Sequence, residues 1–174
     1  PDDFNNATPQ TLPAAFPKGF NAFYLMKYEI SQEQYVEFLN KLTRGQQAQR
    51  FVSTTVGNFM HSGAGQTAPV NRNGVKLMSD PGVLDIRIYG NDLNDNDIAG
   101  EAGDGQNIAC NWMSSVDLLA YLDWAALRPM TELELEKACR GTNTAVAGEY
   151  AWGSTVIAGA TGLGVYGANR QADA

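Results

Sequence analysis

The first half of the chain shows a strand-like pattern followed by a helical one. Large apolar or aromatic side chains alternate with their neighbours through residues 22–30, which is the period of a β-strand with one face turned inward. A capping-box pattern, Ser31 with Gln34, then precedes apolar positions at helical spacing. These positions are Tyr35, Phe38, Leu39 and Leu42. The pattern predicts an amphipathic helix that ends near Thr43.

The second half contains another strand signal and a second helix signal. Asn73-Gly74 is a hairpin-type turn sequence, and residues 84–88 alternate between apolar and charged side chains as a strand does. A helix is expected from Ser115 onward, with its apolar residues on one stripe. That stripe consists of Leu118, Leu119, Leu122, Ala125 and Ala126.

A third, short helix is predicted close behind the second. Thr131 and Glu134 form a capping box, and Gly141 is placed as the residue that ends the helix. Cys139 falls on the expected inner stripe of this helix. The two main apolar ridges, centred on Phe38 and Leu122, should therefore dock against a β-layer.

These elements predict an α+β domain with two to three short helices packed on a small, mostly antiparallel sheet. Residues 1–19 carry four prolines and predict an extended arm, and residues 20–174 predict a single domain. We expect the sheet to be incomplete within this chain, so that the helices need cover from elsewhere. The expected partner is a further part of the same domain or a neighbouring subunit.

Composition narrows the classes of partner. The chain has 174 residues, 44% of them hydrophobic, and a formal net charge of −7. Phosphate backbones are repelled by such a surface, so nucleic acid is not an expected partner. No run approaches the roughly 20 apolar residues of a membrane span. Divalent cations, neutral polymers such as glycans, and proteins remain as candidate partners.

The acidic stretch after the second predicted strand offers a candidate metal site. Asp92, Asn94 and Asn96 have the 1, 3, 5 spacing of a calcium loop, and Asp104 supplies a late carboxylate. Hard oxygen ligands on a flexible loop suit Ca²⁺ better than a transition metal. The alternative is a solvated Asn/Asp/Gly insertion whose side chains cap their own turns. Both interpretations stay open.

The sequence contains two cysteines and one histidine as candidates for thiol or imidazole chemistry. Cys110 and Cys139 are the only cysteines, and either a disulfide or two buried free thiols would account for them. His61 is the sole histidine and lies in a Gly/Ser loop, where a solvated side chain is expected. Trp112, Trp124 and Trp152 are candidate ligand contacts, although core packing is favoured for the last two.

Three blocks of the sequence resemble the formylglycine-generating-enzyme, or sulfatase-modifying-factor, family. They are MKYEISQEQYVEFLN at residues 26–40, YLDW at residues 121–124, and LRPMTELELEKACRG at residues 127–141 with YAWG at residues 150–153. The resemblance implies a variant of the C-type lectin fold. It covers residues 22–153, as the N-terminal part of the domain. The chain is similar in this respect to surface or secreted proteins of Bacteroidota type. The family's copper-binding cysteine pair lies late in the domain. Cys110 and Cys139 do not match that pair by motif position.

Two functions follow as expectations. The favoured one is a non-catalytic, exported or cell-surface binding or assembly module that contacts protein, glycan or copies of itself. The alternative is a formylglycine-generating-type oxidase, or a related metal-dependent oxidase, whose catalytic half lies outside this chain. A structural subunit of a filament or secretion apparatus is a third possibility, in which the Pro-rich arm reaches a neighbour.

Overall fold

The computed structural model describes residues 11–61, 66–144, 146–150 and 153–156. Within these residues six elements follow one another: α1 (Gln32–Leu39), α2 (Arg44–Arg50), β1 (Val75–Ser79), β2 (Ile88–Asn91), α3 (Ser115–Trp124) and α4 (Glu132–Arg140). The chain divides into two compact units. One contains Met26–Pro129, and the other contains the described parts of Pro1–Leu25 and Met130–Ala158.

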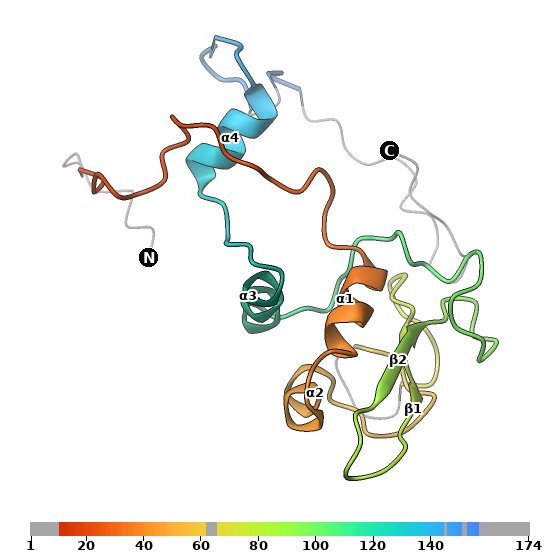
Figure 1. Cartoon of the computed structure of the whole chain (residues 1–174). Coiled ribbons are helices and arrows are strands. Elements are labelled where there is room, and N and C mark those ends of the chain that lie inside the picture. Colours follow the sequence, from red (N-terminus) through yellow and green to blue (C-terminus); the bar gives the residue numbers. More distant parts are fainter. Residues whose placement is uncertain (1–10, 62–65, 145, 151–152, 157–174) are drawn as a thin grey trace. The chain divides into compact units, whose positions relative to one another are not determined.

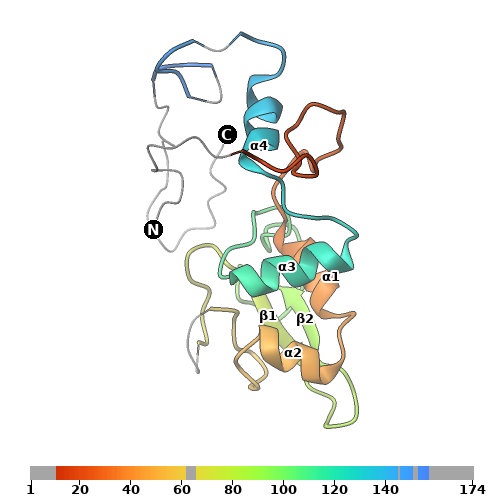
Figure 2. The same cartoon turned by 90° about the vertical axis from the view of Figure 1, so that its left-hand side faces the viewer.

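The Met26–Pro129 unit is built in layers around α1. This helix contacts β2 on one side and α3 on the other, so that it lies between the hairpin and α3 (Figure 1). The turned view places α3 in front of α1 and the hairpin behind them (Figure 2). Phe38 of α1 packs its ring 5.7 Å from that of Tyr121 and 5.5 Å from that of Trp124, measured between ring centroids. The two predicted ridges therefore meet, because Phe38 and Leu122 are both buried in one core.

In the part of the chain that the structure describes, the sheet is an antiparallel hairpin of two strands. Val75 pairs with Asn91 and Leu77 with Tyr89, and the register shifts between Leu77 and Ser79. The tight turn before β1 was predicted at Asn73-Gly74. It is centred two residues earlier, at Asn71 and Arg72, both of which have positive φ. Four helices with a small antiparallel sheet confirm the predicted α+β class, which is consistent with a C-type-lectin-like fold.

The strand predicted over residues 22–30 is absent, and the strand predicted over residues 84–88 is shorter than expected. Residues 22–30 form no strand, because pairing with another segment begins only at the backbone hydrogen bond from Cys110 N to Ile30 O, 2.8 Å long. The alternation in that segment instead reflects exposed aromatic side chains such as Tyr24. The strand predicted over residues 84–88 begins only at Ile88, and Leu84 is exposed in the connecting loop.

Capping boxes define the helix starts. The predicted boxes at Ser31 and Thr131 are confirmed, and Ser114 opens α3 in the same way with Asp117. Helix α2 was not predicted, although Thr43 and Gln46 form an equivalent box. The predicted stripe of α3 is only partly correct, since Leu122 is buried whereas Leu119 is exposed.

The smaller unit is organised around α4. The segment before residue 25 runs along this helix (Figure 1), where Thr131 Oγ1 donates to Pro17 O at 2.8 Å and Lys137 Nζ donates to Gly19 O at 2.5 Å. Cys139 is exposed on α4, so its predicted place on an inner stripe was wrong. The physical reason is that charged residues fill most of this helix and only Glu134 is buried. Within the described part of the chain, no helix is both long and apolar enough to cross a membrane.

Candidate site at the acidic loop

The acidic loop begins where β2 ends and folds back on its own first carboxylate. Asp92 is fully buried, and its two oxygens accept backbone hydrogen bonds from Asn96 and Asp97, each 3.0 Å long. Asp95 and Asp97 both adopt positive φ, which turns the chain around this point. One carboxylate oxygen from each of Asp92, Asp95 and Asp97 lies within 4.8 Å of the others.

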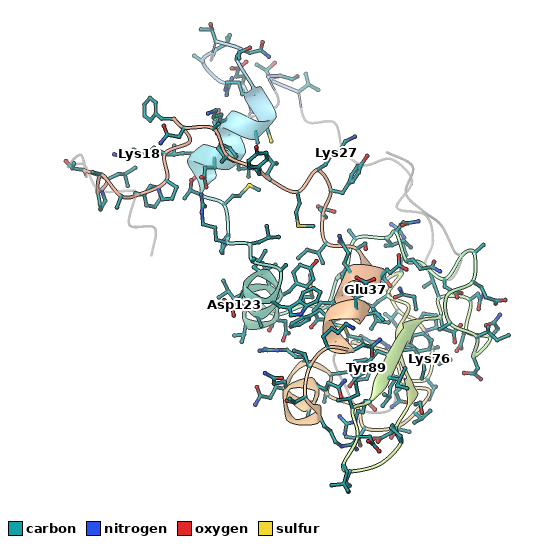
Figure 3. The ribbon with its side chains drawn as sticks, viewed as in Figure 1. Lys18, Lys27, Glu37, Lys76, Tyr89 and Asp123 are labelled. Atoms are coloured by element: carbon teal, nitrogen blue, oxygen red, sulfur yellow. The ribbon has the colours of Figure 1, made fainter. Side chains whose placement is uncertain are left out.

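The ammonium group of Lys76 lies among these three carboxylates. Its Nζ donates to Asp92 Oδ2 at 2.7 Å, to Asp95 Oδ1 at 2.8 Å and to Asp97 Oδ1 at 2.7 Å. Lys76, labelled in Figure 3, comes from β1, and its side chain is only 3% exposed. Its Nζ also lies 4.9 Å from the centroid of the Phe59 ring. The loop therefore already contains a cation, supplied by the protein itself.

This arrangement shifts the ionisation of both partners. Burial disfavours the charged form of Lys76, but the hydrogen bonds that its ammonium donates to the three carboxylates outweigh this effect and raise the pKa of Lys76. Burial likewise opposes ionisation of Asp92, while the hydrogen bonds from Lys76 and the two backbone amides lower the pKa of Asp92 below its usual value. Asp92 and Lys76 are thus held as an ion pair across the neutral pH range.

The structure divides the four predicted metal ligands between different roles. Asp92 belongs to the cluster, whereas Asn94 Oδ1 accepts the backbone amide of Asn96 at 3.1 Å and Asn96 Oδ1 accepts that of Ile98 at 2.9 Å. Asp104 is buried and its Oδ2 accepts the amide of Glu101 at 2.7 Å. Its Oδ1 has no hydrogen-bond partner within the described part of the chain. The cluster members that sequence reasoning missed are Lys76, Asp95 and Asp97.

Calcium binding in this loop stays a prediction, and the position of Lys76 means that calcium would compete with its ammonium group. Oxygen ligands of the right kind converge here, but a divalent cation at their centre has to displace the Lys76 ammonium. We expect calcium to raise the thermal midpoint of a Lys76→Ala variant more than that of the wild type. Differential scanning calorimetry with and without calcium measures this, with Asp92→Asn as control. An equal effect on both proteins would show that Lys76 does not compete with the metal.

The remaining candidate residues lie apart from the acidic cluster. Cys110 packs against the core, and burial raises the pKa of its thiol to about 12. Cys110 and Cys139 are both free thiols here and belong to different units, so the disulfide stays a prediction. The expectation that His61 is solvated was wrong, because it is buried with Nε2 3.2 Å from Ala68 O. Its ring lies 6.1 Å from that of Trp112, which keeps it out of water.

The expectations for the other two tryptophans have different outcomes. Trp124 contacts the core rings of Phe38 and Tyr121 while keeping part of its surface exposed. It therefore lies at the edge of the core, and the core packing favoured from the sequence is only partly correct. Trp152 lies outside the described residues.

Comparison with known proteins places the chain. Comparisons with curated proteins and with solved structures found no match. A family model, the sulfatase-modifying factor enzyme 1-like domain, matches residues 4–172. Since that match spans almost the whole chain, the protein belongs to the formylglycine-generating-enzyme, or FGE-sulfatase, family.

Proposed function

We propose that this chain is a non-catalytic binding or assembly module of an exported or cell-surface protein. The observation that carries the proposal is the outward face of α3, which leaves Val116 63% and Leu119 53% exposed. Apolar side chains of this size on one helix face are typical of a surface that another protein covers. The inward face of the same helix is closed by Asp117, Tyr121 and Leu122, so α3 already has its place in the core.

The proposed occupant of this face is a protein surface, supplied by a further part of the domain or by a neighbouring subunit. A glycan is the weaker candidate here, because Val116 and Leu119 offer no hydrogen-bonding groups for hydroxyls. The acidic net charge of −7 adds a long-range preference for partners that carry basic or neutral surfaces.

Cys110 is not suited to be a metal-binding thiolate of an oxidase site within this chain. A copper-dependent oxidase of this family needs thiolates open to substrate, and metal ligation requires the deprotonated sulfur. The Cys110 thiol has a pKa of about 12 because burial disfavours the thiolate. Oxygen consumption by the purified chain with copper and a cysteine-containing peptide tests the alternative. Turnover by the chain would favour the oxidase, and turnover that is lost in Cys110→Ser would contradict this assignment of Cys110.

A single substitution tests the proposed surface. We expect Leu119→Glu to lower the fluorescence of a hydrophobic dye bound to the protein, with little change in the free energy of unfolding, because Leu119 lies outside the core. Ser115→Glu is the matched control, since it adds the same charge to the exposed side of α3 without removing an apolar group. If both variants bind as much dye as the wild type, the α3 face is not the apolar surface proposed.

A further inference from the structure

A hollow opens in the Met26–Pro129 unit beside the first turn of α1. Its volume is about 700 Å³, within the roughly 300–1,000 Å³ typical of ligand sites. The segment that leads into α1 lines one side with Lys27, Tyr28 and Glu29, and α1 itself contributes Glu33. Asn107 lines it from the segment that follows the acidic loop. The hollow is therefore bounded by two segments that are far apart in the sequence.

Backbone hydrogen bonds hold these two segments together. Gln32 N donates to Ile108 O at 2.9 Å and Glu33 N donates to Gln106 O at 3.1 Å. A bridge between Ser31 and Ala109 continues the same contact. The capping box of α1 fixes the orientation of this first turn as well. A site built on such a frame needs little ordering when a ligand binds, which favours affinity.

The side chains that line the hollow are suited to a cation. Tyr28 is 74% exposed, and the Lys27 ammonium lies over its ring, 5.1 Å from the centroid, so the ring already makes a cation–π contact and leaves further surface exposed. Glu29 and Glu33 are exposed carboxylates with no ion-pair partner within the described residues. Two carboxylates against one ammonium leave the lining with one excess negative charge.

We infer that this hollow binds a cationic side chain, arginine or lysine, presented by an extended segment of a partner protein. A guanidinium can stack on the Tyr28 ring and donate paired hydrogen bonds to a carboxylate. An ammonium can contact the same groups as a point charge. A neutral saccharide would use the ring and the Asn107 amide, but it would leave Glu29 and Glu33 without a counter-charge. The inference deepens the binding function proposed above and does not depend on the α3 face.

A pair of peptides tests the ligand class on the wild-type protein. The probe is a fluorescent pentapeptide with two arginines, and its match carries citrulline, which keeps the shape of arginine without the charge. We expect the citrulline peptide to bind about tenfold more weakly in fluorescence anisotropy, the factor typical of losing a charge-assisted hydrogen bond. Equal binding of the two peptides, or no binding of the arginine peptide at millimolar concentration, would overturn the inference.

Two double variants locate the site. We expect Glu29→Gln with Glu33→Gln to weaken binding of the arginine peptide about tenfold, by the same argument. Glu37→Gln with Asp123→Asn removes the same charge from exposed positions away from the lining (Figure 3) and should leave binding unchanged. Equal weakening by both pairs would mean diffuse attraction to an acidic protein.

The proposal for the α3 face and the inference for the hollow can be refuted independently. Leu119→Glu should leave binding of the arginine peptide unchanged, because Leu119 does not line the hollow. If the peptide fails to bind while Leu119→Glu still lowers dye binding, the α3 proposal stands and the assignment of the hollow is wrong.

Discussion

A Lys76→Met variant is expected to lose about 3–5 kcal/mol of unfolding free energy, the cost of removing one partner from a buried ion pair. Methionine keeps most of the aliphatic stem, so the change is mainly the loss of the ammonium charge, including its contact with the Phe59 ring. Asp92 is fully buried and would lose its counter-charge, whereas Asp97 is largely exposed and can be hydrated instead. Urea unfolding followed by circular dichroism measures the loss.

Three comparisons isolate the charge effect. Lys41→Met removes an exposed lysine and should stay within about 0.5 kcal/mol of the wild type. Adding Asp92→Asn to Lys76→Met should recover part of the loss, because the uncompensated charge is then absent. The pKa of Asp92 is lower in the folded protein than in the unfolded chain. The ionised Asp92 therefore stabilises the fold above the usual carboxyl pKa near 4, and this stabilisation is lost as the pH falls through the pKa of Asp92 in the folded protein. The unfolding free energies of the wild type and of Lys76→Met should therefore converge in strong acid. A Lys76→Met variant that is as stable as the wild type at pH 7 would refute the stabilising role of the Lys76–Asp92 ion pair.

Phe38→Ala is expected to cost a similar amount, about 3–5 kcal/mol, by opening a cavity in the core. Phe38 is fully buried, and its ring contacts those of Tyr35, Tyr121 and Trp124. Its removal therefore uncouples α1 from α3 as well as losing apolar area. Unfolding free energy and the near-ultraviolet circular dichroism of the aromatic cluster should both fall.

The neighbouring residue provides the control for this substitution. Glu37→Ala changes the same helix at an exposed position and should leave the aromatic signal intact. If Phe38→Ala keeps the wild-type stability and spectrum, α1 and α3 do not share one core.

Local patterns predicted the helix starts well and the strands poorly. Ser31 and Thr131 cap helices through contacts within four residues, which a sequence displays directly. Helix α2 carries no apolar stripe, and its place depends on Gln47, whose amide donates to Leu39 O at 3.0 Å and to Arg87 O at 2.9 Å. Such contacts lie up to 40 residues away in the sequence. Strands need a partner in space, and residues 22–30 have none over most of their length.

The acidic loop shows the same limit for the candidate site. Asp92 was predicted because Asn94 and Asn96 follow it at the spacing of a calcium loop, which the sequence displays directly. Lys76 was not, since it reaches the loop only through the pairing of Lys76 with Gly90 in the hairpin. Its position between Val75 and Leu77 in a buried strand was the available signal, because a lysine that is buried requires a counter-charge nearby.

Family membership indicates the fold of the chain but does not determine its function. A fold of this kind can carry an oxidase or a binding surface, and the choice depends on the site rather than on the fold. In the described residues, the exposed side chains of α3 and the acidic lining of the hollow are both suited to protein contacts. They offer one apolar and one charged surface on the same unit.

Sedimentation velocity of the purified chain over a wide concentration range, combined with its thermal unfolding curve, tests the assembly proposal most directly. An uncovered α3 face predicts association that increases with concentration and weakens in Leu119→Glu. A monomer at every concentration that unfolds in one sharp transition would contradict it.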